Sequence, residues 1–79
     1  MPEPTPAQLG TAIRRARKAD GLSIEALGAK SHVHWTSISE IENGKRNPSW
    51  EVVVKLATGL EIGVADLAQL AAEQAKKSR

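Results

Sequence analysis

The stretch SHVHWTSISEIENGKRNPS, residues 31–49, decides the fold of this chain. Its two isoleucines, Ile38 and Ile41, stand three residues apart and predict one buried helical face. The opposite face, at the spacing i, i+3, i+4 and i+7, is polar and is formed by Thr36, Ser39, Glu40 and Asn43. Gly44 ends the pattern, and the basic turn KRNP, residues 45–48, follows it. The stretch therefore predicts a short helix that leaves a polar face exposed.

Two helices are predicted on the N-terminal side of this stretch. Thr5 is a suitable N-cap, Pro6 suits the first helical position, and Gln8 can complete a capping box. This first helix is expected to end near Gly21, because glycine favours the left-handed turn that terminates many helices. Ser23 then caps a short second helix with the sequence IEALGAKS.

Two more helices are predicted on the C-terminal side. Ser49 can cap the segment WEVVVKLATGL, whose three consecutive valines would also suit a strand. We favour a helix because its apolar residues keep a period of 3.6, namely Trp50, Val53, Ala57 and Leu60. The last helix covers VADLAQLAAEQAKK, with Val64, Leu67, Ala68 and Ala71 along one face.

Five helices, with the second and third only a few residues apart, describe a compact all-α domain with a central helix-turn-helix. A chain of 79 residues has room for one such domain. We expect it to cover residues 6–75, after a disordered N-terminus at residues 1–5 and before a basic tail at residues 76–79.

Charge is distributed unevenly along the chain. Residues 14–46 contain seven Lys or Arg and four Asp or Glu, whereas residues 47–75 contain one Lys and four Asp or Glu. The first block thus carries a net charge of +3 and the second a net charge of −3. This dipolar arrangement indicates a polyanionic partner on one side of the domain, although a normally solvated surface would also carry such charges.

Several classes of site are disfavoured by the sequence. There are no cysteines, which excludes disulfides, thiolate metal sites and cysteine nucleophiles. His32, His34 and Glu40 suggest a metal or hydrolase site, but the H-x-H pair lacks a third ligand at a fixed spacing. The chain also has neither an apolar run of about 18 residues nor a signal peptide. We therefore expect a cytoplasmic protein that is not an enzyme and has no metal, no cofactor and no membrane partner.

Residues 9–67 resemble the Cro and phage-repressor type helix-turn-helix domains, also called the XRE family. The resemblance rests on a series of spaced features: IRRAR, GLS, EAL, Val33, TSIS, IENGKRNPS and DL. It implies a lambda repressor-like DNA-binding domain of bacterial or phage origin, whose third helix lies in the major groove. The polar face of residues 35–43 suits this role, since base edges offer hydrogen-bonding groups and phosphates attract cations.

The resemblance also implies roles for individual residues. Base contacts are expected from Trp35, Thr36, Ser37, Ser39 and Glu40. Phosphate contacts are expected from Ser23, His34, Asn43, Lys45 and Arg46. Thr36 can bond a base edge or touch a thymine methyl group, and Glu40 can accept a hydrogen bond from a cytosine amino group. Glu40 could equally be an ordinary solvated charge on the helix.

Arg17 and Glu42 resemble a pair that forms an internal salt bridge between the first and third helices of the family. Such a pair would hold the recognition helix in position, and removing one partner is costly when the pair is buried. The resemblance therefore assigns Arg17 and Glu42 to structure, and not to DNA reading or acid–base chemistry.

Three positions depart from the family pattern. His32 stands where the family has a glycine in a left-handed turn, so some backbone strain is expected. Ile24 replaces a glutamine, which removes one expected phosphate contact. Glu61 and Gly63 exchange the usual glycine and cap residue, which leaves the geometry before the last helix open.

A lone module binds DNA weakly, so we expect a homodimeric repressor on a palindromic double-stranded operator with half-sites about 34 Å apart. The expected interface lies on the fourth and fifth helices and includes Trp50, Val52 and Val54. Two alternatives remain at this point. One is a protein-interaction adaptor or coactivator-like module, which an exposed Trp35 would suit. The other is the antitoxin of a toxin–antitoxin pair.

Overall fold

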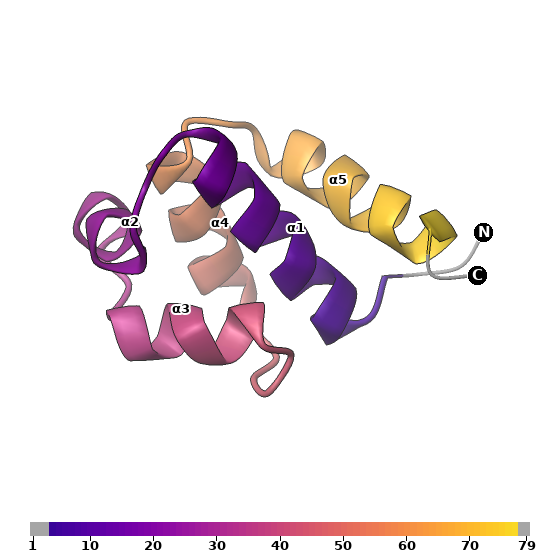
Figure 1. Ribbon diagram of the computed structural model, residues 1–79, viewed down its shortest axis with the longest axis horizontal. Helices are drawn as coiled ribbons and strands as arrows, with labels where there is room; N and C mark the ends of the chain where they lie inside the picture. Colours follow the sequence, from indigo (N-terminus) through magenta and orange to yellow (C-terminus); the bar gives the residue numbers. More distant parts are fainter. Residues whose placement is uncertain (1–3, 78–79) are drawn as a thin grey trace.

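The computed structural model describes residues 4–77, and this part of the chain forms five helices (Figure 1). In chain order they are α1 (Pro6–Ala19), α2 (Ile24–Ser31), α3 (Trp35–Glu42), α4 (Trp50–Gly59) and α5 (Val64–Lys77). The predicted all-α fold with a central helix-turn-helix, formed by α2 and α3, is confirmed. The segment with three valines is helical, as the 3.6-residue period indicated.

The predicted N-caps explain where three of the helices begin. The hydroxyl oxygens of Thr5, Ser23 and Ser49 accept hydrogen bonds from backbone N–H groups at the starts of α1, α2 and α4. At α1 the capping box is complete, because the N–H of Thr5 also donates to Oε1 of Gln8 over 2.7 Å. These bonds satisfy donors that the first helical turn would otherwise leave without partners.

The predicted boundaries of the domain need two corrections. Thr5, placed in the disordered N-terminus, is ordered because it caps α1. Helix α5 continues to Lys77, so the first two residues of the predicted basic tail are helical. Pro4, also in the predicted disordered segment, is described and precedes the cap, whereas residues 1–3 and 78–79 lie outside the described residues.

The start of α5 resolves the question left open by Glu61 and Gly63. The N–H of Gly63 donates to Oδ2 of Asp66 over 3.4 Å, so a carboxylate in the first turn of α5 reaches back over the helix start. A negative charge is also favourable at a helix N-terminus. Glu61 adopts the left-handed conformation expected of the glycine that it replaces, with φ at 58°.

The helices enclose one core. In Figure 1, α1 and α5 pack along each other across the upper part of the molecule, and α3 lies beneath α1. Helix α2 packs against α3 and α4 at one end. The largest fully buried side chains come from all five helices and are Ile13, Leu27, Ile38, Ile41, Leu56 and Leu67. Burial of Ile38 and Ile41 leaves the other side of α3 facing outward, at the lower edge of the molecule.

The close crossing of α1 and α3 depends on a glycine. A Cβ atom added to Gly10 would lie 2.0 Å from the carbonyl oxygen of Ile41 and 3.0 Å from the Cα of Glu42. Both neighbours are backbone atoms of α3, which cannot give way as a flexible side chain can. Gly10 therefore lets α3 approach α1 closely, so that residues at the C-terminal end of α3 can reach the side chains of α1.

The turn between α2 and α3 has the predicted left-handed residue. His32 has φ 58° and ψ 33° and ends α2, and Val33 then inserts into the core with 7% of its surface exposed. Val33 anchors the turn, in which only three residues separate the end of α2 from the start of α3. Ile24, which replaces an expected phosphate-contacting glutamine, also packs against the core.

Candidate nucleic-acid interface

The N-terminal end of α3 is organised by His34. Its Nδ1 atom accepts a hydrogen bond from the backbone N–H of Thr36 over 3.3 Å, so the imidazole acts as the N-cap of α3. The same nitrogen lies 2.7 Å from Oγ1 of Thr36. The imidazole is also stacked on the indole of Trp35, with ring centroids 5.8 Å apart. Trp35 is 49% exposed, so an aromatic pair and a hydroxyl are displayed together at the start of the helix.

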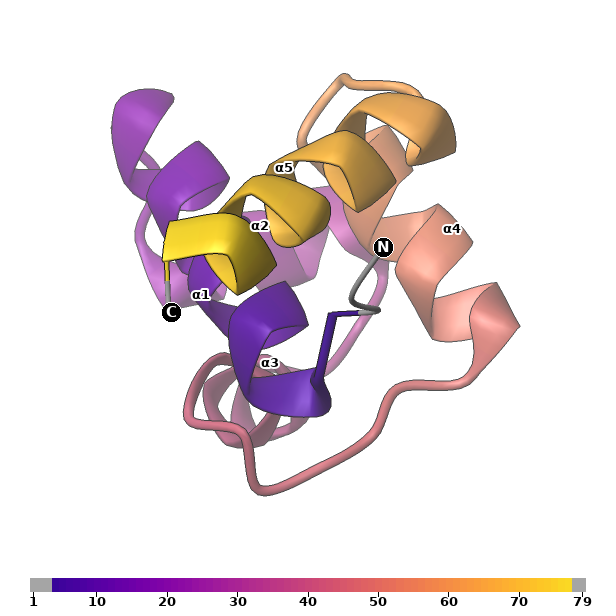
Figure 2. The same ribbon diagram turned by 90° about the vertical axis from the view of Figure 1, so that its right-hand side faces the viewer.

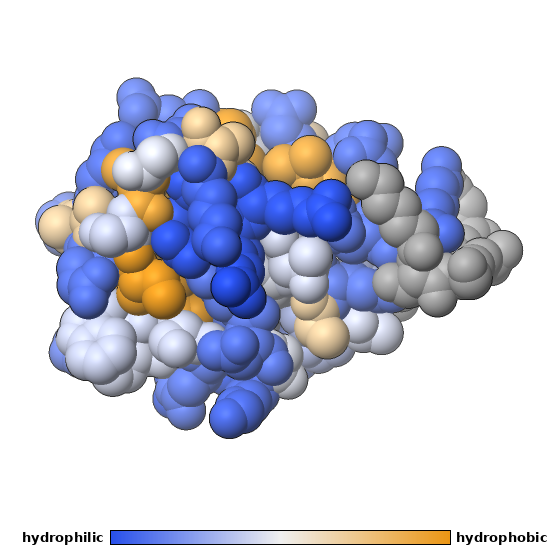
Figure 3. Space-filling view, in the orientation of Figure 1, coloured by the Kyte–Doolittle hydropathy of each residue, from blue (hydrophilic) through white to orange (hydrophobic). Residues whose placement is uncertain are grey.

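The outward face of α3 is polar along its length. Thr36, Glu40 and Asn43 are exposed, and Ser37 and Ser39 are half-buried at its margins. On the side shown in Figure 3, the lower edge formed by α3 and the loop after it is coloured neutral to hydrophilic, and the hydrophobic patches lie above it. An adaptor module would have been expected to display an apolar patch here, and Trp35 alone supplies one large apolar group.

The segment between α3 and α4 passes along the same lower edge before it rises to α4 (Figure 2). Lys45, Arg46 and Asn47 in this segment are exposed. Nη2 of Arg46 lies 3.1 Å from Oε1 of Glu40, and Nη1 lies 3.5 Å from Oγ of Ser37. The family resemblance implied a phosphate contact for Arg46 and a base contact for Glu40, and it did not indicate that the two side chains would pair.

The Glu40–Arg46 pair is an exposed interaction, with 47% and 52% of the two side chains accessible. Surface ion pairs contribute only about 0–1 kcal/mol, so this one can open when a phosphate or a base competes for either partner. In the free protein it neutralises part of the negative charge that Glu40 brings to the exposed face of α3.

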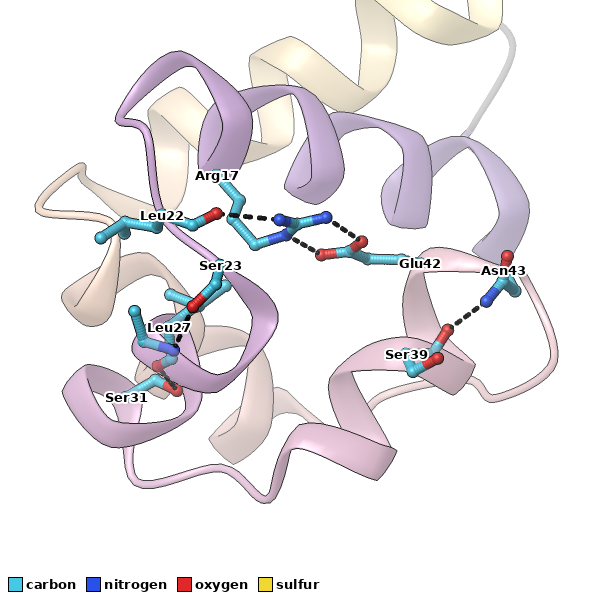
Figure 4. A network of polar contacts seen from close by, with 9 residues as sticks. Arg17, Leu22, Ser23, Leu27, Ser31, Ser39, Glu42 and Asn43 are labelled. Atoms are coloured by element: carbon cyan, nitrogen blue, oxygen red, sulfur yellow. Dashed lines mark hydrogen bonds and ion pairs between the residues drawn. The ribbon is translucent and has the colours of Figure 1, made fainter.

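Two other predicted contact residues also serve as helix caps. The side-chain amide of Asn43 donates to the backbone carbonyl of Ser39 over 2.8 Å at the end of α3 (Figure 4). The hydroxyl oxygen of Ser23 accepts from the N–H of Ala26 over 3.0 Å at the start of α2. Each group therefore helps to hold a helix end while it remains exposed to solvent.

Arg17 and Glu42, expected to pair, form a buried ion pair between α1 and α3 (Figure 4). Nε of Arg17 lies 2.8 Å from Oε2 of Glu42, and Nη2 lies 3.0 Å from Oε1. Nη1 donates to the carbonyl oxygen of Leu22 over 2.9 Å, which ties in the turn before α2. The hydrogen bonds to Glu42 outweigh desolvation and raise the pKa of the Arg17 guanidinium above its ordinary value.

A metal site and a membrane span, both considered from the sequence, can be tested on the described residues. Among residues 4–77, no three His, Asp or Glu side chains gather where they could hold a metal ion. In the same part of the chain, no helix has the length and apolar character needed to cross a bilayer. His32 and His34, which had suggested a metal site in the sequence, end α2 and cap α3.

The geometry of the central helix-turn-helix agrees with comparison to known protein families. A model described as a helix-turn-helix domain matches residues 8–70. The chain belongs to this helix-turn-helix family. It is a DNA-binding transcriptional regulator and not an enzyme. The resemblance inferred from the sequence is thereby confirmed.

Solved structures support the same assignment. The restriction-modification controller protein C.AhdI from Aeromonas hydrophila shares 35% identity with this chain, with a TM-score of 0.76. The match covers 78% of this chain and 94% of the controller protein. The clp gene regulator ClgR from Corynebacterium glutamicum shares 32% identity over 98% of this chain and 84% of its own, with a TM-score of 0.86. An HTH_3 family transcriptional regulator from Vibrio cholerae has 25% identity and a TM-score of 0.79, over 90% of this chain and 39% of its own. Comparison with curated protein sequences gives no match.

A second feature of this helix-turn-helix domain is an apolar groove away from α3. Its lining includes Leu9 of α1, Trp50 and Val53 of α4, and Val64, Leu67 and Ala71 of α5. Trp50 is 69% exposed. The sequence named Val52 and Val54 beside Trp50, but Val53 lines the groove, whereas Val52 borders a different hollow beside Ser37 and Arg46. The helical period of Trp50, Val53 and Ala57 was the signal that Val53 lies on the same side of α4 as Trp50.

Proposed function

We propose that this helix-turn-helix domain acts as a homodimeric repressor that binds a palindromic operator in a bacterial cytoplasm, with α3 in the major groove. The observation that carries the proposal is the exposed polar face of α3, which lies beside the basic segment of residues 45–48. Base edges require hydrogen-bonding side chains and phosphates require cations, and both occur together on this edge.

The two kinds of contact are assigned to two sets of residues. We assign base contacts to the side chains on the outward face of α3 and its margins: Trp35, Thr36, Ser37, Ser39 and Glu40. We assign phosphate contacts to the caps and the basic segment: Ser23, His34, Asn43, Lys45 and Arg46. Arg17 and Glu42 hold the angle of α3 and contact no DNA. Helix ends and cations suit phosphates because they supply N–H donors and positive charge.

We place the dimer interface on the apolar groove between α1, α4 and α5. An exposed tryptophan beside Val53 and Leu67 is the kind of aromatic anchor that protein interfaces bury. The commonest arrangement of two identical chains is a two-fold dimer, which would place two copies of α3 in successive major grooves. Such a dimer matches a palindrome with half-sites about 34 Å apart.

Selection of bound sequences from a random DNA pool tests this function. The purified protein is expected to enrich a palindrome and to bind it with a Kd of about 10⁻⁸ to 10⁻¹⁰ M at physiological salt. Sedimentation equilibrium should show a dimer, and a reporter gene under the selected operator should be repressed. Failure to enrich any sequence would argue against DNA reading, and a monomer that protects a single half-site would argue against the dimer.

One observation favours a second candidate function. The half-exposed indole of Trp35 also suits a protein partner, so the same fold could serve as an interaction adaptor. The selection experiment separates the two functions, since an adaptor would return no enriched sequence. Trp35→Ala would then weaken capture of the protein partner and leave no DNA preference to lose.

A further inference from the structure

The N-cap of α3 fixes the direction of the hydrogen bond between His34 and Thr36. A backbone N–H can only donate, and that of Thr36 lies 3.3 Å from Nδ1 of His34. Nδ1 must therefore offer a lone pair, and the neutral ring carries its hydrogen on Nε2. The hydroxyl of Thr36 lies 2.7 Å from the same nitrogen. With no hydrogen on Nδ1, the hydroxyl is the donor in this contact.

We propose that Thr36 reads DNA as a hydrogen-bond acceptor only, and so selects a base that carries an amino group. A hydroxyl has one hydrogen and two lone pairs, and the hydrogen of Thr36 is committed to His34. In the major groove, amino groups belong to adenine and cytosine, whereas guanine and thymine present acceptor oxygens. This inference rests on the proposed function, because it requires α3 to lie in that groove.

The constraint is built into the folded start of α3. An unconstrained threonine hydroxyl rotates to suit its partner and can read either a donor or an acceptor. Here the imidazole is held in place by the cap contact and by stacking on Trp35, with an angle of 28° between the ring planes. Thr36 remains exposed, so its lone pairs are available to a base. His34 is thus a positioning residue for base selection, in addition to its proposed phosphate contact.

The tautomer of His34 can be measured in the free protein. A two-bond proton–nitrogen NMR correlation distinguishes a ring that is protonated on Nε2 from one that is protonated on Nδ1. We expect the neutral imidazole of His34 to be in the Nε2–H form. The Nδ1–H form would overturn the inference whether or not the protein binds DNA.

The second test compares base preferences of the wild type and of Thr36→Val, which keeps the shape of the side chain and removes the hydroxyl. If selection returns no motif, the proposed function fails, and the NMR result still decides the polarity of Thr36. If a motif is found, the preference lost in Thr36→Val should be for adenine or cytosine. Replacing that base by purine or 2-pyrimidinone, which lack the amino group, should weaken wild-type binding about 2- to 10-fold and leave Thr36→Val unchanged. A lost preference for guanine or thymine would overturn the proposal.

The third test removes the acceptor. His34→Gly keeps an acceptable N-cap and frees the hydroxyl of Thr36, so the ratio of affinities between amino-bearing and oxygen-bearing bases should fall toward one at that position only. Ser23→Gly is the matched control, since it alters a cap on α2 and should weaken all sequences without changing any ratio. If His34→Gly keeps the ratio of the wild type, His34 does not set the polarity and the inference is wrong.

Discussion

Arg17 on α1 holds both carboxylate oxygens of Glu42 on α3, and only 9% and 4% of the two side chains are exposed. The third hydrogen bond of the guanidinium goes to the carbonyl of Leu22, in the turn that leads to α2. One side chain therefore connects the first helix to α3 and to the turn that precedes α2. Since Glu42 is the last residue of α3, the pair fixes the end of the helix opposite the His34 cap.

Glu42→Ala is expected to lower the free energy of unfolding by about 3–5 kcal/mol, because it leaves a buried guanidinium without its charge partner. This is a large share of the roughly 4–12 kcal/mol available to a domain of this size. Urea denaturation monitored by circular dichroism measures the loss. The double change Arg17→Met with Glu42→Leu should recover most of it, leaving only the carbonyl of Leu22 without its bond. A loss below about 1 kcal/mol in Glu42→Ala would contradict a structural role.

Gly10→Ala should be among the most destabilising small substitutions in the domain. The added methyl group would meet the carbonyl oxygen of Ile41 at 2.0 Å, so α1 and α3 must move apart, at a cost of about 3 kcal/mol or more. Gly63→Ala is the control, because its methyl group would meet only the movable carboxylate of Asp66, at 3.3 Å. Thermal unfolding of the two variants should separate them clearly, and equal melting temperatures would show that the crossing is not tight.

His32→Gly should stabilise the domain by about 0.5–1 kcal/mol. The left-handed conformation costs a residue with a side chain about 1–2 kcal/mol, and the greater chain entropy of glycine offsets part of this gain. Glu61→Gly should gain less, because Glu61 also forms an ion pair with Lys30 over 3.0 Å. Chemical denaturation of both variants gives the order, and a destabilised His32→Gly would mean that the imidazole makes compensating contacts.

Patterns with a local physical cause were predictable from the sequence. The helices were predicted from two signals that each act within a few residues. These are the 3.6-residue period of apolar side chains and the N-caps Thr5, Ser23 and Ser49. The family resemblance predicted the left-handed turn at His32 and the pairing of Arg17 with Glu42. The features that could not be predicted depend on contacts between segments that are separate in the sequence.

The Glu40–Arg46 pair and the apolar groove are of this second kind. Arg46 reaches Glu40 because the loop after α3 brings residue 46 close to the exposed face of the preceding helix. Val53 lines the groove because α1 and α5 lie on that side of α4, which a helical period alone does not specify. The contact of Asp66 with the N–H of Gly63 was also missed, because Gly63 has no side chain to complete the capping-box pattern that Thr5 and Gln8 show.

The two tryptophans should have separable functions. Trp50→Ser is expected to weaken the proposed dimer and, through it, binding to the full palindrome, because it removes an exposed anchor from the groove. Trp35→Ser should leave the dimer intact and change binding to a half-site. Sedimentation equilibrium and half-site titrations of both variants measure the two effects, with folding checked by circular dichroism. If Trp50→Ser remains as dimeric as the wild type, the interface lies elsewhere.

Glu40 and Arg46 should have opposite effects on binding to unselected DNA. Arg46→Ala removes one cation from the proposed phosphate set, so affinity should fall for all sequences and the salt dependence should drop by about one counterion. Glu40→Ala removes a negative charge and releases Arg46 from its 3.1 Å ion pair, so binding to unselected DNA should strengthen while preference at one base pair is lost. Titrations against operator and unselected DNA at several salt concentrations measure the changes in affinity, base preference and salt dependence. The double variant shows whether the effects of the two substitutions are additive. Identical, uniform losses in the two single variants would refute the division between reading and phosphate contacts.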